Sequence, residues 1–427
     1  MKNFAALLLT ALIVLSLNAQ DTLTIMHYNI LNYGNYSSYC TSANNNHEVK
    51  DGYLRTIIAH TQPHIFTVNE VSQYDFYHTR LLNNVLNHDV DYYRRAAITN
   101  IAGSSIINGF FYDSRKFVLH SQSIPQSYVR DINLYRLYYR SSSLAAGDTT
   151  WINCIVAHLK ASSGSTNAAA RASMTSAVMT WLRTNALPGN YLIMGDFNLY
   201  TSSEEAYQNL INPINANQAF RFYDPVDTPG NWSNNYAYAG VHTQSVSSSG
   251  NGCQASGGLD DRFDFILASG SIMNGTEGIR YLEGSYEAIG QDGNHFNKSI
   301  NDYPSNVSVP SAVLNALASN SDHLPVVMKV VAGKGPNSIA ERPAQSFHAY
   351  VYAREGDTPG LGIIAAKAMK CSIEIHNPAG ALISRKDYSL TGGRNDLNVE
   401  MPFTGKGLYL LSVTDDRGTR ITLKLIL

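Results

Sequence analysis

Short apolar runs that end in polar residues recur along the first three quarters of the chain. They occupy residues 22–30, 64–70, 105–112, 151–159, 191–196, 260–267 and 321–328. Runs of four to eight apolar residues bounded by turn-forming residues are typical of strands buried in a sheet. A polar side chain at the end of such a strand is costly to bury, so it needs either a partner or a function.

Three stretches between these runs have helical spacing of their apolar residues. They are residues 48–60, 73–87 and 167–184. The last of them joins two of the apolar runs, so we expect a strand, a crossover helix and a further strand in that part of the chain.

Two regions have other patterns. Residues 105–112 and 116–119 predict a β-hairpin around Asp113. From about residue 201 to 258 the composition shifts to Asn, Ser, Gly and Tyr. A loop this long inside a compact chain is usually functional or flexible. Its aromatic residues, Trp232 among them, form either a substrate-facing surface or part of a plain surface loop.

The polar residues at the strand ends are the candidate site residues. In chain order they are Asn29, Glu70, Tyr112, His158, Asp196, Asn198, Asp264, Asp322 and His323. A glutamate at the end of a buried strand needs a cation or donors, which makes Glu70 a candidate metal ligand. Asp264 stands in a strongly apolar strand and needs a fixed partner, which is usually histidine where catalysis is involved. Neighbouring side chains of a strand point in opposite directions, so we expect Asp322 on the metal side of a site and His323 on the proton side.

Several of these residues have a structural alternative when each is taken alone. Asn29 is either a satisfied structural amide or a site residue, and His158 is either a core histidine or a ligand of some kind. Tyr112 either donates its hydroxyl toward a phosphate or is an aromatic residue at a strand edge. The Gly195-Asp-Phe-Asn198 segment is either an active-site signature or a strand-end turn.

Composition limits the classes of function. The chain has 427 residues, of which 44% are hydrophobic and 15% charged, enough for two or three domains with a large core. The formal net charge of −2 excludes a protein that holds nucleic acid through an excess of Lys and Arg alone. If the partner is a polyanion, a metal must supply part of the attraction.

The four cysteines show no C-x-x-C pattern and so do not predict a zinc site. Cys154 lies in an apolar strand, where we expect it to pack. A disulfide between Cys40 and Cys253, which lie in loops, remains open for an exported protein.

The N-terminus predicts a signal peptide over residues 1–20. Its apolar stretch, residues 5–17, is too short to span a bilayer comfortably and is followed by a small residue, Ala19. A membrane anchor is the open alternative. We expect no stable membrane insertion and a monomeric protein.

Five motifs together resemble those of the endonuclease/exonuclease/phosphatase superfamily, the group of deoxyribonuclease I. They are Tyr28-Asn-Ile, Val68-Asn-Glu, His158-Leu-Lys, Gly195-Asp-Phe-Asn and Ser321-Asp-His. The resemblance covers about residues 22–332. It implies an α/β fold, a four-layer α/β/β/α sandwich of two mixed sheets with helices outside, and one divalent-metal phosphoesterase site at the sheet edges.

The resemblance also implies metal ligands. Glu70 resembles the principal Mg²⁺ ligand, with Asn29 and Asp322 assisting, and Mn²⁺ or Ca²⁺ are alternatives. Magnesium takes oxygen ligands and keeps several waters, so two carboxylates and a substrate phosphate suffice.

The remaining roles follow from the same resemblance. Asp264 resembles the carboxylate that orients His323, and Asp196 the one that positions the attacking water. Either His323 or Asp196 is the proton acceptor. Asn198 and His158 resemble the groups that hold the phosphate and stabilise its developing charge.

The expected function is that of a secreted, metal-dependent phosphodiesterase, an endonuclease that cleaves DNA or RNA with little sequence preference. Arg262 does not stand where inositol polyphosphate phosphatases have their arginine, and we find no exposed apolar hairpin of the kind that sphingomyelinase-like enzymes insert in membranes. A phospholipid or small-phosphoester hydrolase, or an inactive binding module of the same fold, are the alternatives.

The C-terminal part has a different pattern. A linker is expected at residues 333–343, and short strand-like runs from 344 to 427 predict a small all-β sandwich. Asn377-Pro-Ala-Gly, Gly407-Leu-Tyr and the terminal Lys424-Leu-Ile-Leu resemble the sorting domains of the type IX secretion system of Bacteroidetes. This resemblance implies that the secretion machinery is a partner and that the protein crosses the periplasm to the cell surface or the medium. A carbohydrate- or surface-binding module is the alternative.

Overall fold

The structure is a computed structural model. It describes residues 20–141, 144, 149–333, 347–352, 360–365, 367–398, 407–416, 418 and 420–426. The predicted signal peptide, apart from residue 20, and the predicted linker, apart from residue 333, lie outside the described residues. No helix of the described part is long and apolar enough to cross a membrane.

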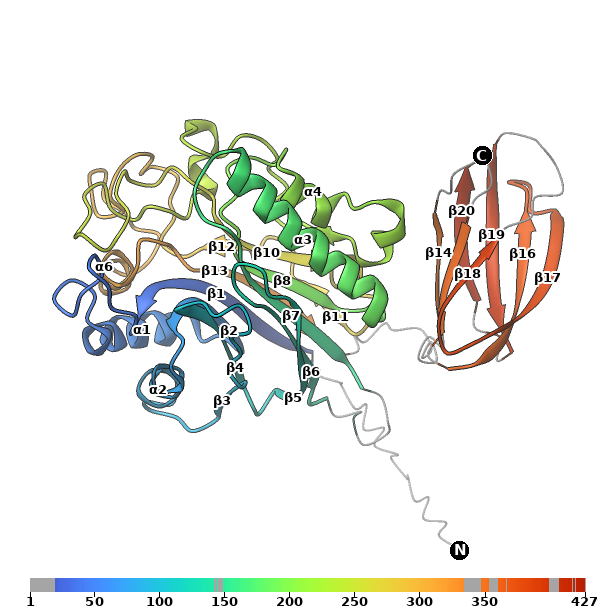
Figure 1. The fold of residues 1–427 in the computed structure, drawn as a ribbon, viewed down its shortest axis with the longest axis horizontal. Coiled ribbons are helices and arrows are strands. Elements are labelled where there is room, and N and C mark those ends of the chain that lie inside the picture. Colours follow the sequence, from blue (N-terminus) through green and yellow to red (C-terminus); the bar gives the residue numbers. More distant parts are fainter. Residues whose placement is uncertain are drawn as a thin grey trace, which may run out of the picture.

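Two mixed sheets form the centre of residues 20–333 (Figure 1). The first has the order β11-β13-β1-β2-β4-β3, with β12 beside β13. Its strands are β1 (Asp21–Tyr33), β2 (Ile65–Ser72), β3 (Tyr93–Arg95), β4 (Ile106–Asp113), β11 (Ile279–Tyr281), β12 (Glu287–Ala288) and β13 (Val326–Ala332). The second has the order β5-β6-β7-β8-β10-β9. Its strands are β5 (Phe117–Gln126), β6 (Ile132–Tyr139), β7 (Trp151–His158), β8 (Tyr191–Asp196), β9 (Phe222–Tyr223) and β10 (Asp264–Ser269).

Helices cover the outer face of each sheet, as Figure 1 shows. The α-helices are α1 (His47–Thr61), α2 (Asp75–Arg80), α3 (Ser165–Asn185), α4 (Glu205–Ile211), α5 (Gly270–Asn274) and α6 (Ser311–Asn320). Shorter turns are the π-helix η1 (Leu81–Leu86) and the 3₁₀-helices η3 (Asn215–Phe220) and η4 (Tyr236–Val241).

Three apolar cores separate the four layers. One lies between α1, α6 and the first sheet and contains Leu54 and Leu317. The second, with Cys154, lies between the two sheets. The third lies between the second sheet and α3 with α4, and it contains Val178 and Leu210. The four-layer α/β/β/α sandwich expected from the sequence is therefore confirmed.

Several local predictions are confirmed and others are corrected. Helices occur at 47–61 and 165–185 as expected, and β7 and β8 are parallel across their helical crossover. The expected hairpin at residues 105–119 is wrong, because β4 pairs with β2 and β3 in the first sheet whereas β5 pairs with β6 in the second. The turn at Asp113 passes the chain from one sheet to the other.

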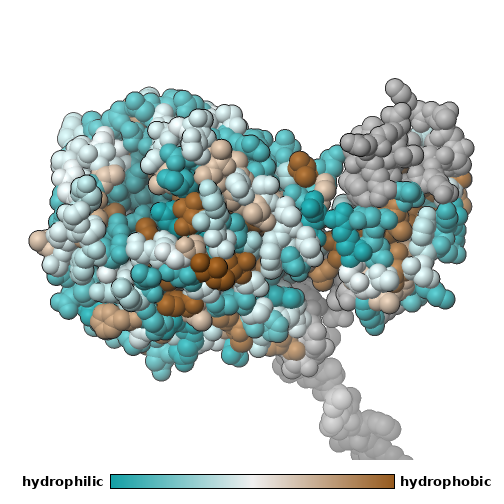
Figure 2. Space-filling model, in the orientation of Figure 1, coloured by the Kyte–Doolittle hydropathy of each residue, from teal (hydrophilic) through white to brown (hydrophobic). Residues whose placement is uncertain are grey.

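The stretch from residue 201 to 258 is more structured than its composition suggests. It contains α4, η3, β9 and η4. Trp232 is fully buried and packs edge to face on Tyr207, so this residue lies in the core and not on a substrate-facing surface. Figure 2 shows a mostly hydrophilic surface on the visible face, with hydrophobic residues scattered in it.

The C-terminal module is a small all-β sandwich, as expected. Its strands are β14 (Phe347–Tyr352), β15 (Gly360–Ala365), β16 (Met369–His376), β17 (Leu382–Leu390), β18 (Gly393–Asn398), β19 (Leu408–Asp415) and β20 (Arg420–Ile426). They form sheets of order β14-β15-β18 and β17-β16-β19-β20. Leu361 of the first sheet and Leu411 of the second belong to one apolar core.

Candidate active site

The register of the strands brings most of the candidate residues to one edge of the sandwich. In the first sheet, β1 and β2 are parallel and Asn29 lies opposite Asn69, next to Glu70. In the second sheet, Asp196 lies between His158 of β7 and Asp264 of β10. The two sheets face each other, so these strand ends meet.

Glu70 and Asn29 are the centre of one half of the site. The Nδ2 atom of Asn29 donates to Oε1 of Glu70 at 3.1 Å and to Oδ2 of Asp196 at 3.0 Å. The other oxygen of Glu70, Oε2, accepts from the backbone N–H and from Nδ2 of Asn32 at 3.1 and 3.2 Å. The Glu70 side chain is 15% exposed, so it is within reach of solvent.

Glu70, His158 and Asp196 are a candidate metal centre. Each offers one ligand atom, and these atoms all lie within 4.8 Å of one another. Among the described residues this is the one group of three His, Cys, Asp or Glu side chains with such spacing. Two carboxylate oxygens suit Mg²⁺ or Ca²⁺, and a neutral imidazole beside them also suits Mn²⁺, so the donor set fits a divalent cation.

His158 is poised as a neutral imidazole. Burial lowers the pKa of His158 well below its usual value, and the charge of Arg130 acts in the same direction. Its Nε2 atom lies 3.5 Å from Oδ2 of Asp196 and 3.9 Å from Oε1 of Glu70. A neutral imidazole has a lone pair to offer to a cation or a proton.

Asp264 and His323 form the other half of the site. Nδ1 of His323 donates to Oδ2 of Asp264 at 2.7 Å, and the hydroxyl of Thr243 donates to the same oxygen at 2.7 Å. The Nε2 atom of His323 then points to Asp196, at 3.7 Å from Oδ2. Two amide nitrogens are further neighbours of this atom, Nε2 of Gln244 at 2.7 Å and Nδ2 of Asn29 at 3.4 Å.

The pKa values of His323 and Asp196 are both shifted by their surroundings. Burial alone would lower the pKa of His323, but the charges of Asp264 and Asp196 raise it well above its usual value. Burial raises the pKa of Asp196 to about 7, which places it near neutral pH. The candidate site therefore contains titratable groups whose pKa values differ from their usual values.

Asn198 and Asp322 lie beside this centre. Asn198 has a positive φ of 51°, and its backbone N–H donates to Oδ1 of Asp196 at 3.0 Å. The Oδ2 atom of Asp322 accepts from the N–H of Ala255 at 2.9 Å and from Gln244 at 3.3 Å. Asp322 is not part of the three-residue cluster, and its role as a metal ligand stays a prediction, as does that of Asn29.

Tyr112 is the candidate that the structure removes from the site. Strand β4 is antiparallel to β2, and Tyr112 pairs with Ile65 at the start of that strand. Glu70 lies five residues further along, roughly 17 Å away at about 3.3 Å per residue. Tyr112 is instead half-buried against the core between the sheets.

Several site residues were not found from the sequence. Asn69 accepts the backbone N–H of Asp196 at 2.8 Å and donates to Asn108 at 2.7 Å, so it joins the two sheets below the site. Arg130, between β5 and β6, donates to the carbonyl of Leu159 at 3.2 Å. The only sequence signal for Asn69 and Asn108 was an amide inside an otherwise apolar strand.

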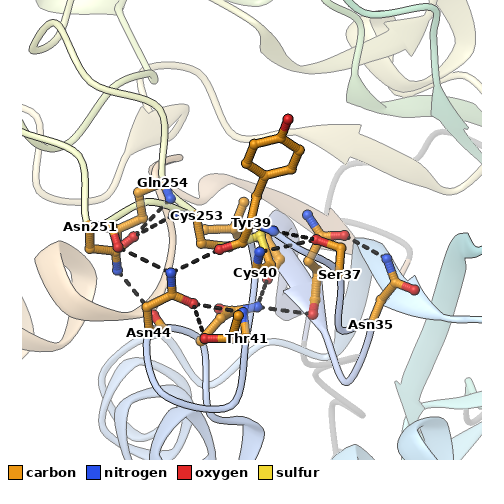
Figure 3. Close-up of a disulfide and its surroundings, with 12 residues drawn as sticks. Asn35, Ser37, Tyr39, Cys40, Thr41, Asn44, Asn251, Cys253 and Gln254 are labelled. Atoms are coloured by element: carbon orange, nitrogen blue, oxygen red, sulfur yellow. Dashed lines mark hydrogen bonds between the residues drawn. A yellow bond between two sulfur atoms is a disulfide. The ribbon is translucent and has the colours of Figure 1, made fainter.

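A disulfide joins two loops close to the site (Figure 3). Cys40, in the loop after β1, is bonded to Cys253, with 4.5 Å between the Cα atoms. Asn44 and Asn251 reinforce it, since the side chain of each donates to the backbone carbonyl of the other at 3.1 Å. The disulfide that the sequence left open is therefore present, and it fixes the loop whose Ala255 N–H holds Asp322.

No family model matches this sequence, and no curated protein matches it. Solved structures of similar fold include an endonuclease/exonuclease/phosphatase from Beutenbergia cavernae DSM 12333, 14% identical with a TM-score of 0.42 over 95% of this chain and 100% of that one. The TDP2 of D. rerio in complex with a single-strand DNA product is 12% identical with a TM-score of 0.44, over 72% and 98%. The human Nocturnin catalytic domain is 14% identical with a TM-score of 0.43, over 73% and 97%. At such low sequence identities and TM-scores these similarities support no conclusion about activity. Any such conclusion has to come from the residues of this chain.

Proposed function

We propose that this chain hydrolyses phosphodiester bonds with the aid of a divalent cation and that its preferred substrate is nucleic acid. The observation that supports this most is the meeting of two groups at one sheet edge. One is the cluster of Glu70, His158 and Asp196, and the other is the His323–Asp264 pair, whose imidazole lies 3.7 Å from Asp196.

Different residues of the chain would bind the cation, carry the proton and hold the phosphate. Glu70 would hold the cation, with Asp196 and His158 as the further donors. A bound divalent cation polarises a phosphoryl oxygen and offsets its charge. Asp264 holds Nδ1 of His323, so the exchangeable proton of the imidazole is carried at Nε2, on the side of Asp196. Asn198 would face the phosphate, and His158 would do so as the alternative to its role as a donor to the cation.

The charge of the chain supports the choice of substrate. Backbone contacts and a cation suffice to hold nucleic acid without reading bases, and a chain with a net charge of −2 fits binding that depends more on the cation than on Lys and Arg. We therefore expect cleavage with little sequence preference.

Nicking of supercoiled plasmid tests the proposal. Purified protein with Mg²⁺, Mn²⁺ or Ca²⁺ should nick the plasmid, and EDTA should stop it. Glu70→Gln should be inactive, whereas Glu48→Gln, the same change at an exposed glutamate of α1, should be active. Full activity in EDTA or in folded Glu70→Gln would refute the mechanism.

A substrate panel tests the choice of nucleic acid. It compares duplex DNA, single-stranded DNA, RNA, sphingomyelin and an inositol polyphosphate at equal enzyme concentration. Strong preference for the lipid or the inositol phosphate would replace nucleic acid as the substrate.

We infer in addition that the protein is exported and that its C-terminal module serves transport. The disulfide between Cys40 and Cys253 supports an oxidising destination, and the candidate site lies wholly before residue 333. A chain truncated after Gly333 should keep its activity in the test tube and accumulate in the periplasm of a host with type IX machinery. Loss of activity in a folded truncation, or normal export, would overturn this inference.

A further inference from the structure

We propose that Lys50 is a positioning residue for Glu70, the carboxylate to which the proposed function assigns the cation. The two side chains are not in direct contact. The connection runs from helix α1 through the last four residues of β1, Ile30–Tyr33, where the pairing with β2 shifts register and the backbone makes a turn. It explains why a lysine is buried at this place.

Lys50 is 2% exposed and fills a cage of uncharged oxygens. Its Nζ atom donates to the backbone carbonyls of Ile30 and Leu31, each at 2.8 Å, and to Oδ1 of Asn45 at 2.7 Å. An ammonium group has three N–H donors, and the cage offers three acceptors. The side chain is therefore satisfied in its charged form without a carboxylate partner among these contacts.

Asn45 extends the cage to the next residue of the turn. Its Nδ2 atom donates to the carbonyls of Leu31 and Asn32 at 3.1 and 3.0 Å. The neighbouring residue of α1, Asp51, accepts the hydroxyl of Tyr33 at 2.5 Å. Helix α1, together with Asn45 two residues before its start, thus holds every residue of the turn from Ile30 to Tyr33.

The turn needs to be held because its backbone is unusual. Leu31 and Asn32 have φ values of 45° and 47°, the left-handed region that side chains other than glycine disfavour. This conformation points the N–H and the Nδ2 of Asn32 at Oε2 of Glu70. If the turn relaxed, one oxygen of the carboxylate would lose both of its donors.

The hydrogen bonds of Lys50, and not its charge, carry this role. Burial lowers the pKa of this lysine to about 7, and the charges of Asp322 and Glu70 oppose that fall. Near neutral pH the lysine is therefore charged in only part of the molecules, and its charge repels a cation. Its contribution to the position of Glu70 thus rests on the contacts that hold the turn.

Partners that orient a ligand typically change metal affinity by about 10 to 100-fold when they are removed. We therefore expect Lys50→Met to raise the dissociation constant for Mn²⁺ by that factor. The assay is isothermal titration of the full chain with Mn²⁺ alone, with circular dichroism and thermal melting to verify the fold. Arg55→Met is the matched control, because Arg55 lies on the same helix but donates to the carbonyl of Asn84.

Two further variants keep the test decisive if Lys50→Met does not fold. Asn45→Ser removes an acceptor of Lys50 and the donor to Leu31 and Asn32, and it should weaken Mn²⁺ binding in the same way. Asn32→Gly keeps the positive φ and the backbone N–H but deletes Nδ2, and it should weaken binding to a smaller extent.

The outcomes separate this inference from the proposed function. The inference is supported if folded Lys50→Met binds Mn²⁺ more weakly while Arg55→Met binds it unchanged. If Lys50→Met does not fold, Asn45→Ser takes its place in this comparison. A folded Lys50→Met or Asn45→Ser that binds Mn²⁺ as the unaltered chain does overturns it and leaves the proposed function intact. An unaltered chain that binds no Mn²⁺ refutes the metal site of the proposed function, and the role of Lys50 with it.

Discussion

Glu70 and Asp264 are both carboxylates in apolar strands, but they differ in exposure and in the groups that donate hydrogen bonds to them. Glu70 is 15% exposed and takes its hydrogen bonds from the neutral amides of Asn29 and Asn32. Asp264 is fully buried, and its Oδ2 takes hydrogen bonds from His323 and Thr243.

The donors decide what each carboxylate is able to do. Neutral donors fix the orientation of Glu70 but leave its charge uncompensated, so a cation is attracted there. Asp264 raises the pKa of His323, and the charge of the histidine compensates that of the carboxylate. This carboxylate therefore orients its partner and does not attract a metal ion. In the proposed mechanism, one edge of the sandwich thus has a metal side at Glu70 and a proton side at Asp264 and His323.

Replacing the histidine should have the largest effect on the rate. His323→Ala removes the group that carries a proton at Nε2, and we expect kcat to fall by about 10² to 10⁴-fold. Mn²⁺ affinity, measured by calorimetry, should not change. A large loss of Mn²⁺ affinity in this variant would show that the two sides are not separate.

Asp264→Asn should have a smaller effect of the same kind. The amide keeps the shape of the side chain but loses the charge that raises the pKa of His323, so that pKa should fall toward its usual value. We expect a decrease in kcat of about 10²-fold, the lower end of the range for proton transfer by a side chain. NMR titration of the imidazole, with His295 as an internal reference, checks the shift, and an unmoved pKa would contradict the assignment.

The polar residues at the ends of apolar strands were sufficient to find most of the residues that the structure brings together in the candidate site. Glu70, His158, Asp196, Asp264 and His323 were all expected and all meet at one edge. Strand pattern predicts which residues reach the end of a buried strand. It does not predict whether neighbouring strands are parallel, and this is why Tyr112, at the far end of the antiparallel β4, was misplaced.

The supports of the site could not be predicted in this way. Lys50 stands in a helix, where a lysine usually faces solvent, and its burial depends on carbonyls that a separate turn supplies. Gln244 meets His323 only through the folding of a long, polar loop. Such contacts are set by tertiary structure and leave no periodic signal in the chain.

Removing the disulfide should affect stability more than rate. Cys40→Ser with Cys253→Ser opens a link across 213 residues, and we expect the free energy of unfolding to fall by about 2–4 kcal/mol. Urea denaturation measures this difference. Equal stability of the variant and the oxidised chain would mean that the hydrogen bonds between Asn44 and Asn251 keep the two loops in place without the disulfide.

Tyr112→Phe should have no effect on the rate, because this residue lies at the far end of β4 from the site. Steady-state cleavage of the same substrate gives the comparison. A clear loss of kcat would restore Tyr112 to the site and contradict the register described above.

The most direct test of the division between the two sides is a calorimetric titration of Mn²⁺ into Glu70→Gln and into Asp264→Asn. Both changes replace one carboxylate by an amide of the same shape, so they differ only in place. We predict that Glu70→Gln weakens Mn²⁺ binding by at least about tenfold and that Asp264→Asn leaves it unchanged. Equal weakening in the two variants, or undiminished binding in Glu70→Gln, would contradict the account.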